Sequence, residues 1–253
     1  MFIKAPSILC ALISLVMPNV MEATPVGTMD IVHSGYGANG VMTVWGGGLS
    51  DLDVYGGVYM LNKTDGTGLG NIWPNGLIGG FCIELHQWSP DTTLKYDVVG
   101  LHEVNNSFMG GTMGTEKADY LAELWGRFYN PAWADGGPYS SEEKSKAEAF
   151  AAAVWEIIYE DLPASPLSWD VTTDGSAGAH GFFASNVDAD AANSWLRALT
   201  GCGPKAQLMA VVNDGKQDFI IQVPEPATIC LLGLGGLAFL RKRKCYSVKQ
   251  LAT

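Results

Sequence analysis

Short apolar and β-branched runs, separated by glycine, asparagine and aspartate, dominate the first part of the chain and return near its end. This pattern predicts strands over 41–45, 54–61, 77–86 and 95–104. Two further apolar runs, 206–212 and 217–222, flank Asn213-Asp214-Gly215, a combination that favours a hairpin. Segments of this kind are typical of a mostly antiparallel sandwich or a barrel-like sheet.

The middle of the chain changes to a helical period, with apolar residues three and four positions apart. This period predicts three helices, at 116–128, 141–159 and 188–199. Thr115 is a suitable cap for the first helix, and Ser140 with Glu143 forms a capping box for the second. Gly201 follows the third at the usual stop position. The fold class is therefore α+β, a mostly antiparallel sheet with a helical insertion of two to three helices.

Both ends of the chain have the composition of targeting segments. Lys4 precedes an apolar stretch over 8–17, which predicts a signal peptide at 1–23. Near the other end, the uncharged run 227–240 predicts a short transmembrane helix, although a comfortable span needs roughly 20 residues. Four basic residues follow at 241–244 and favour a cytoplasmic location for the tail at 246–253. The domain between these segments is expected at 24–222.

The junction before the second apolar run reads Val223-Pro224-Glu225-Pro226. Two prolines around one acid stop both helix and sheet, so this junction is an extended break. The order of this break, the apolar run and the basic cluster over 223–245 resembles the PEP-CTERM sorting signal of exopolysaccharide-producing Gram-negative bacteria. The resemblance implies exosortase as a processing partner, export across the inner membrane, a membrane-associated precursor, and a final place at the cell surface or in the extracellular matrix.

Charge narrows the range of partners. The whole chain has a formal net charge of -11, and the expected domain keeps 9 of the 15 basic and 24 of the 26 acidic residues, which gives -15. Phosphate backbones are bound by clustered lysine and arginine. This composition therefore disfavours nucleic acid as a partner, and extracellular polysaccharide or surface proteins are the candidate partners instead.

Two of the five cysteines, Cys82 and Cys202, lie in the expected domain. An exported compartment is oxidising, so a disulfide between them is one interpretation. A second interpretation comes from residues 79–84 (GGFCIE) and 147–157 (AEAFAAAVWEI). Together these segments resemble the thioester domains of bacterial surface adhesins, in which a strand cysteine is joined to a helix glutamine.

The second resemblance carries over only in part. Cys82 matches the cysteine, and Trp155 and Glu156 lie in the matching part of the helix, but the glutamine position is occupied by Ala151. Alanine has no acyl group with which to form a thioester. The resemblance therefore implies a thioester-type fold without the covalent chemistry.

Recognised catalytic motifs are missing from the sequence, which has no Gly-x-Ser-x-Gly, phosphate loop or dinucleotide fingerprint. Its four histidines are scattered, and neither a metal site nor a cofactor is expected. The favoured hypothesis is a non-enzymatic surface or matrix protein that works in adhesion or in an exopolysaccharide biofilm. The alternative is a secreted polysaccharide-acting hydrolase with paired carboxylates among four candidates: Asp51, Asp53, Glu84 and Glu156.

Tryptophan is frequent, and exposed tryptophan is a good platform for sugar rings or partner surfaces. Trp125, Trp155 and Trp195 fall on apolar helix faces and are expected to be buried. The candidates for an exposed contact surface lie beside prolines or polar loop residues: Trp73, Trp88 and Trp133.

Overall fold

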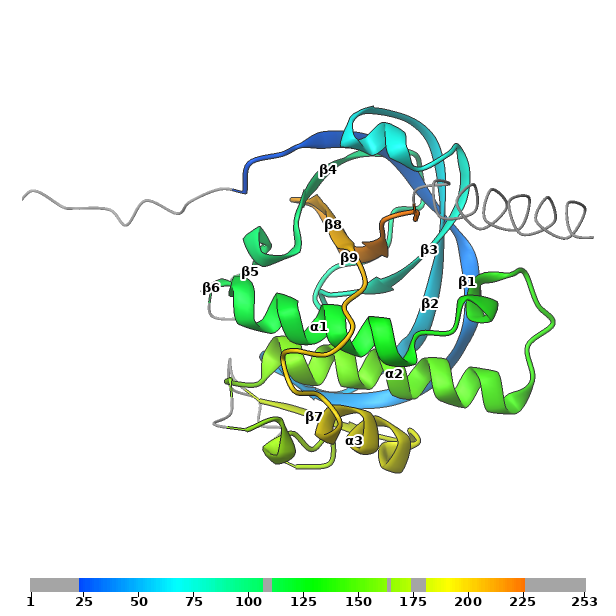
Figure 1. Cartoon of the computed structure of the whole chain (residues 1–253). Helices are drawn as coiled ribbons and strands as arrows, with labels where there is room; N and C mark the ends of the chain where they lie inside the picture. Colours follow the sequence, from blue (N-terminus) through cyan, green and yellow to red (C-terminus); the bar gives the residue numbers. More distant parts are fainter. Residues whose placement is uncertain (1–22, 107–110, 163–164, 174–180, 226–253) are drawn as a thin grey trace, which may run out of the picture.

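Six strands close into an antiparallel barrel in the computed structural model, which describes residues 23–106, 111–162, 165–173 and 181–225 (Figure 1). Around the barrel the strands are β1 (Gly27–Gly46), β2 (Leu49–Gly68), β3 (Gly76–Cys82), β9 (Lys216–Gln222), β8 (Leu208–Asn213) and β4 (Leu94–Gly100). Closure follows because β1 pairs with both β2 and β4. The expectation of a mostly antiparallel, barrel-like sheet is confirmed.

The hairpin of β1 and β2 is much longer than the pattern predicted. Each strand has 20 residues, and the far end of β1, from Thr43 to Gly46, leaves the barrel to pair with β7 (Phe182–Ser185). Glycines interrupt the alternation along both strands and hid their length. Gly57 has φ of +134°, a conformation that glycine adopts at no steric cost.

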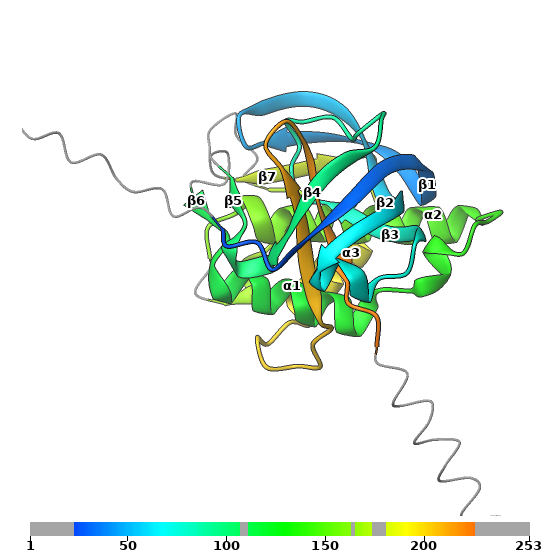
Figure 2. The ribbon, with the colours of Figure 1, turned by 90° about the horizontal axis from the view of Figure 1, so that it is seen from above.

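Three helices form a layer beside the barrel: α1 (Gly114–Phe128), α2 (Ser141–Tyr159) and α3 (Ala189–Arg197). Helix α2 packs against β1 and β2 and also contacts both other helices. The two ends of the described chain leave the barrel on different sides (Figures 1 and 2). Short elements complete the fold: 3-10 turns η1 (Leu69–Ile72), η2 (Leu101–Glu103), η4 (Pro131–Ala134) and η5 (Pro166–Ser168), and a small pair of strands, β5 (Asn105–Asn106) and β6 (Gly111–Thr112).

The helix ends test the capping predictions directly. The capping box of α2 is confirmed, since the Glu143 backbone N–H donates to Ser140 Oγ at 3.2 Å and the Ser140 N–H donates to Glu143 Oε2 at 2.8 Å. The prediction of Thr115 as the cap of α1 is wrong, because the helix begins at Gly114 and Thr115 lies within its first turn. Helix α3 is capped by Asp188, whose Oδ1 accepts from the Ala191 N–H at 3.0 Å.

One hydrophobic core joins the barrel strands to the helix layer, and part of it lies between α2 and the two long strands. The second half of α2 is buried, with small alanines beside Phe150 and Trp155. A glutamine at the end of β9 also joins the layers, since Gln222 Oε1 accepts from the Trp125 indole N–H at 2.9 Å. The expected signal peptide (1–23) and transmembrane segment (227–240) lie outside the described residues, except for Ala23. Within the described part of the chain, no helix has the length and apolar character needed to cross a membrane.

Candidate functional site

A cavity of about 390 Å³ opens where the long hairpin, the segment after β3 and β9 meet. Its size falls within the roughly 300–1,000 Å³ of typical ligand sites. The rim consists of exposed side chains: Trp88 is 85% exposed, Tyr55 50% and Tyr36 37%. The deeper lining is buried and includes Cys82, Trp155 and Gln217.

The segment that carries Trp88 is tied to the barrel on two sides. The Trp88 carbonyl accepts from the Gln217 N–H of β9 at 3.1 Å, and the Pro90 carbonyl accepts from the His33 N–H of β1 at 2.9 Å. The Leu85 N–H, closer to β3, donates to Tyr159 Oη of α2 at 3.0 Å. The backbone is therefore fixed while the Trp88 ring projects into solvent.

Tyr36 reaches the cavity because β1 is irregular at this point. The pairing of β1 with β2 shifts between His33 and Tyr36 and again between Tyr36 and Asn39. Bulges of this kind redirect side chains and are common next to binding sites. As a result the Tyr36 ring lies 4.8 Å from the Tyr55 ring and 5.1 Å from the Tyr59 ring, measured between centroids.

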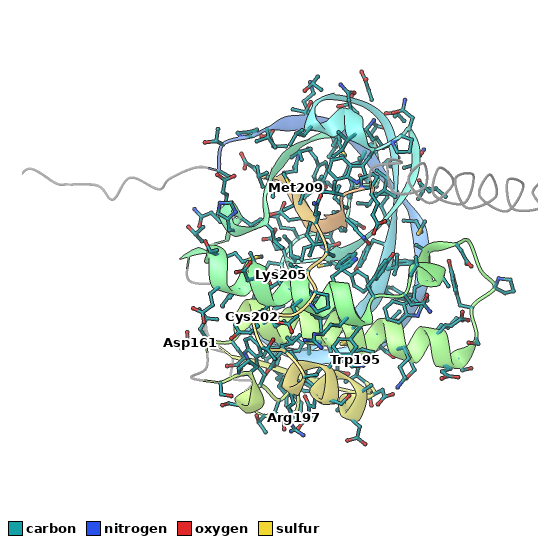
Figure 3. The ribbon with its side chains drawn as sticks, viewed as in Figure 1. Asp161, Trp195, Arg197, Cys202, Lys205 and Met209 are labelled. Atoms are coloured by element: carbon teal, nitrogen blue, oxygen red, sulfur yellow. The ribbon has the colours of Figure 1, made fainter. Side chains whose placement is uncertain are left out.

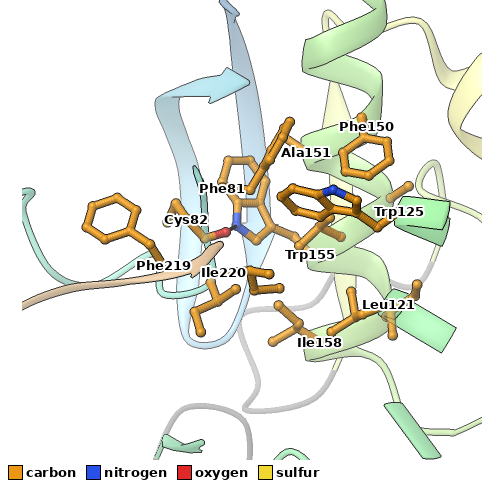
Figure 4. Packing of buried hydrophobic residues seen from close by; sticks show 14 of the residues in the cluster. Phe81, Cys82, Leu121, Trp125, Phe150, Ala151, Trp155, Ile158, Phe219 and Ile220 are labelled. Atoms are coloured by element: carbon orange, nitrogen blue, oxygen red, sulfur yellow. Dashed lines mark hydrogen bonds between the residues drawn. The ribbon is translucent and has the colours of Figure 1, made fainter. Parts of the chain in front are cut away.

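The buried end of the cavity contains the strand cysteine and the helix tryptophan that the sequence paired. The Trp155 indole N–H donates to the Cys82 carbonyl at 2.9 Å, and the Cys82 thiol donates to the Glu84 carbonyl at 2.9 Å. Ala151 lies one turn before Trp155, on the same side of α2 (Figure 4). Burial raises the pKa of the Cys82 thiol, so it stays protonated and is a poor nucleophile.

The proposed disulfide is not formed, because both cysteines are free. Cys82 is buried at the end of β3, whereas Cys202 is exposed in the segment after α3 (Figure 3). Chain export made pairing plausible, but the sequence carried no information on the position of either thiol. The structure therefore corrects this interpretation.

The four candidate carboxylates do not gather at the cavity. Asp53 is the one carboxylate among the described residues that line it, and its Oδ1 accepts from Thr43 Oγ1 at 2.7 Å. Asp51 is exposed nearby, and Glu84 is buried. Glu156 is buried as well, where its Oε1 accepts from the Asp170 N–H at 2.8 Å. A pair of carboxylates on either side of a bound sugar is not present among these lining residues.

A buried acid on β9 was missed by the sequence reasoning. Desolvation raises the pKa of Asp218 to about 8, although the Asn213 N–H donates to its Oδ1 at 2.9 Å. Nearby Glu84 adds to the shift. The signal was available, because Lys216–Gln222 reads as a strand with an acid among apolar residues, but the pattern does not show which face is inside.

The tryptophan predictions divide clearly. Trp88 is exposed as predicted, whereas Trp73 and Trp133 are 2% and 3% exposed and the prediction of exposure is wrong for them. Trp73 Nε1–H donates to the Gln222 carbonyl at 2.8 Å, which explains how its polar end is accommodated. Trp125 and Trp155 are buried as expected, and Trp195 is partly buried.

The end of the described chain presents the proline-rich junction. Strand β9 ends at Gln222, and the Val223 N–H still donates to the Gln207 carbonyl at 2.8 Å. Pro224 and Glu225 are exposed, and Pro226 lies outside the described residues. The family model for the PEP-CTERM protein-sorting motif matches residues 222–244. The chain carries a PEP-CTERM protein-sorting motif.

The PEP-CTERM motif implies that the protein is exported, processed by exosortase and sorted to the cell surface of a Gram-negative bacterium. Pro224 and Glu225, the exposed residues that follow the anchored strand β9, are accessible to such processing. No curated protein and no solved structure matches the chain. Among the described residues, no group of three or more His, Cys, Asp or Glu side chains could hold a metal ion.

Proposed function

We propose that the protein is a non-enzymatic component of the cell surface or extracellular matrix that binds exopolysaccharide through the cavity beside Trp88. The PEP-CTERM motif supports the location, because it directs the exported domain towards the compartment where such polysaccharides lie. Adhesion and biofilm association follow from binding in that compartment.

The observation that carries this proposal is the display of Trp88. The Trp88 ring is 85% exposed, on a backbone that is held at the Trp88 and Pro90 carbonyls. Exposing this apolar ring to water costs free energy and does not stabilise the fold. Exposed aromatic rings beside a partly buried cavity are suited to stacking on sugar rings. Tyr36 and Tyr55 extend the same aromatic rim.

Binding is favoured over hydrolysis because of the carboxylates. Glycoside hydrolysis commonly uses two carboxyl groups, separated by about 5 to 9.5 Å, on either side of the scissile bond. Asp53 is the one carboxylate found among the described lining residues, and it is exposed. This composition suits orientation of a ligand better than acid and base catalysis.

We further propose a thioester-type architecture that has no covalent function. The hydrogen bond from Trp155 to the Cys82 carbonyl joins the two segments of the resemblance. Ala151 occupies the place where an acyl donor would be required, and Cys82 is a protonated, buried thiol.

Two experiments test the function. Deletion of 224–253 in the producing cell should abolish sorting, as followed by fractionation, and unchanged localisation would count against the proposed route.

The full chain, purified in mild detergent, should bind matrix polysaccharide from that cell. Trp88→Ala should weaken binding by about tenfold or more, which corresponds to roughly 1.4 kcal/mol, whereas Leu77→Ala removes an exposed apolar side chain outside the cavity lining and should not. Equal binding by both variants would contradict the proposal.

A further inference from the structure

We propose that the cavity selects a cationic sugar, namely an amino sugar with a free ammonium group, within the bound polysaccharide. This inference rests on the proposed function and adds the chemical class of the ligand. It is drawn from three properties of the lining: its charge, its aromatic faces and its hydrogen-bond acceptors.

The charge of the lining excludes acidic sugars as preferred ligands. No lysine or arginine is found among the described residues that line the cavity, and this lining includes the carboxylate of Asp53. Burial lowers the pKa of His86, which leaves that ring neutral at pH 7. A uronate would therefore meet Asp53 without a compensating cation, on a domain whose formal charge is -15.

Asp53 is held in a defined orientation. Its Oδ1 accepts from Thr43 Oγ1 at 2.7 Å, and Thr43 Oγ1 in turn is 3.2 Å from the Asn186 amide nitrogen, which donates to it. The Asp53 side chain shares a strand face with that of Tyr55, two residues further along β2. An ammonium group near this carboxylate would therefore also lie close to an aromatic face.

The aromatic rim suits a cation as well as a sugar ring. Tyr36, Tyr55 and Trp88 present exposed rings, and the first two lie 4.8 Å apart. A cation over such faces is attracted by the negative potential of the ring. Burial raises the pKa of Tyr36, so this ring stays neutral and keeps its electron-rich face at physiological pH.

A hydrogen-bond acceptor of Gln87 in the lining lacks a partner. Gln87 Oε1 is buried and accepts no hydrogen bond, while Gln87 itself lines the cavity. A buried acceptor without a donor costs free energy until a donor arrives. An ammonium group brings three donors and no acceptor, which complements the excess of acceptors here.

The test compares three short oligomers by calorimetry on the full chain in mild detergent: glucosamine, N-acetylglucosamine and galacturonic acid. The glucosamine oligomer should bind best and the galacturonic acid oligomer worst. Asp53→Asn should weaken binding of the glucosamine oligomer by about threefold to tenfold and leave binding of the N-acetylated oligomer unchanged. Asp51→Asn is the matched control, since it removes the same charge from an exposed position outside the lining, and it should have little effect.

The outcomes separate the two proposals. If no oligomer binds, and matrix polysaccharide does not bind either, the proposed function fails and this inference fails with it. If the N-acetylated or the acidic oligomer binds as well as the glucosamine oligomer, polysaccharide binding stands and the preference for a cation is overturned. Equal losses in Asp53→Asn and Asp51→Asn would also overturn it, because the effect would then come from net charge alone.

Discussion

The corner between α1 and α3 and the cavity end of the barrel treat buried polar groups in opposite ways. At the corner, Glu123 is fully buried, and its Oε1 is 2.8 Å from Arg127 Nε, which donates to it. The Thr200 N–H donates to both carboxylate oxygens, at 3.2 and 3.1 Å. Desolvation acts to raise the pKa of Glu123, but these and neighbouring hydrogen bonds outweigh it and lower the pKa.

At the cavity end, polar groups are left with fewer partners. Gln87 Oε1 and His33 Nε2 are buried and form no hydrogen bond. Asp218, behind the cavity on β9, has its pKa raised to about 8, chiefly by desolvation. A structural corner satisfies its polar groups internally, whereas a surface that must pair with a ligand keeps some of them open. Whether buried polar groups have partners within the protein therefore distinguishes the corner, which holds the fold together, from the cavity end, which is available for binding.

A large loss of stability is expected when the corner is broken. Glu123→Ala should lower the free energy of unfolding by about 2 to 4 kcal/mol, because it leaves the Thr200 N–H and the Arg127 guanidinium without their acceptor. Denaturant titration measures this change. Glu116→Ala, at an exposed position of the same helix, is the control and should change stability by less than about 0.5 kcal/mol. Similar losses in both variants would show that the buried network has no special role.

The next effect concerns Asp218 and depends on pH. The pKa of the Asp218 carboxyl is about 8 in the folded protein, above its ordinary value. As the pH rises, this carboxyl therefore loses its proton in the unfolded chain before it does so in the folded protein. The free energy of unfolding falls as a result between about pH 4 and pH 8. Asp218→Asn keeps an acceptor for the Asn213 N–H and removes the titration. It should raise the free energy of unfolding by up to about 5 kcal/mol at pH 8 and change it little at pH 4.

Asp214→Asn serves as the control for this prediction, since Asp214 is exposed in the turn between β8 and β9. Its effect should be within about 0.5 kcal/mol at both pH values. A stabilisation by Asp218→Asn that does not vary with pH would contradict the assignment of the titration to this carboxyl group.

A smaller change in stability is expected at the rim. Trp88→Ala should alter the free energy of unfolding by less than about 0.5 kcal/mol, since the ring is largely in solvent. Trp155→Ala, in the buried end of the same cavity, should cost about 3 to 5 kcal/mol. Thermal or denaturant unfolding distinguishes the two, and a large loss with Trp88→Ala would mean that this ring supports the fold.

The cysteines provide a chemical test with no expected change in stability. Iodoacetamide should modify Cys202 in the native protein and reach Cys82 only after unfolding, as read by peptide mapping. Intact mass should show no loss of ammonia and no addition of an amine nucleophile, because Ala151 offers no acyl group. Loss of one ammonia, reversed by amine addition, would instead show an intact thioester.

Local signals predicted some elements well and others poorly. The bounds of α2 followed from its capping box, which depends on residues three apart, and the hairpin of β8 and β9 followed from Asn213-Asp214-Gly215. The full length of β1 could not be predicted, because its glycines are explained only by close approach of other segments. At Gly37, for example, a Cβ would clash with the Trp133 carbonyl oxygen.

The candidate site was predictable in part. Trp88 was identified, because polar neighbours and a nearby proline indicated an exposed loop. Trp73 and Trp133 shared the same local signal but are buried, since long-range contacts decide burial. The meeting of Tyr36, Tyr55 and Trp88 depends on barrel closure and on the irregular pairing of β1, neither of which is visible in a local pattern.

Hydrogen exchange on the full chain, with and without matrix polysaccharide, tests the contrast between the two regions most directly. Binding at the cavity predicts slower exchange over 52–59 and 83–90 and unchanged exchange over 197–206, in the corner after α3. Protection centred on 197–206, or bound polysaccharide without protection at the cavity segments, would contradict the account.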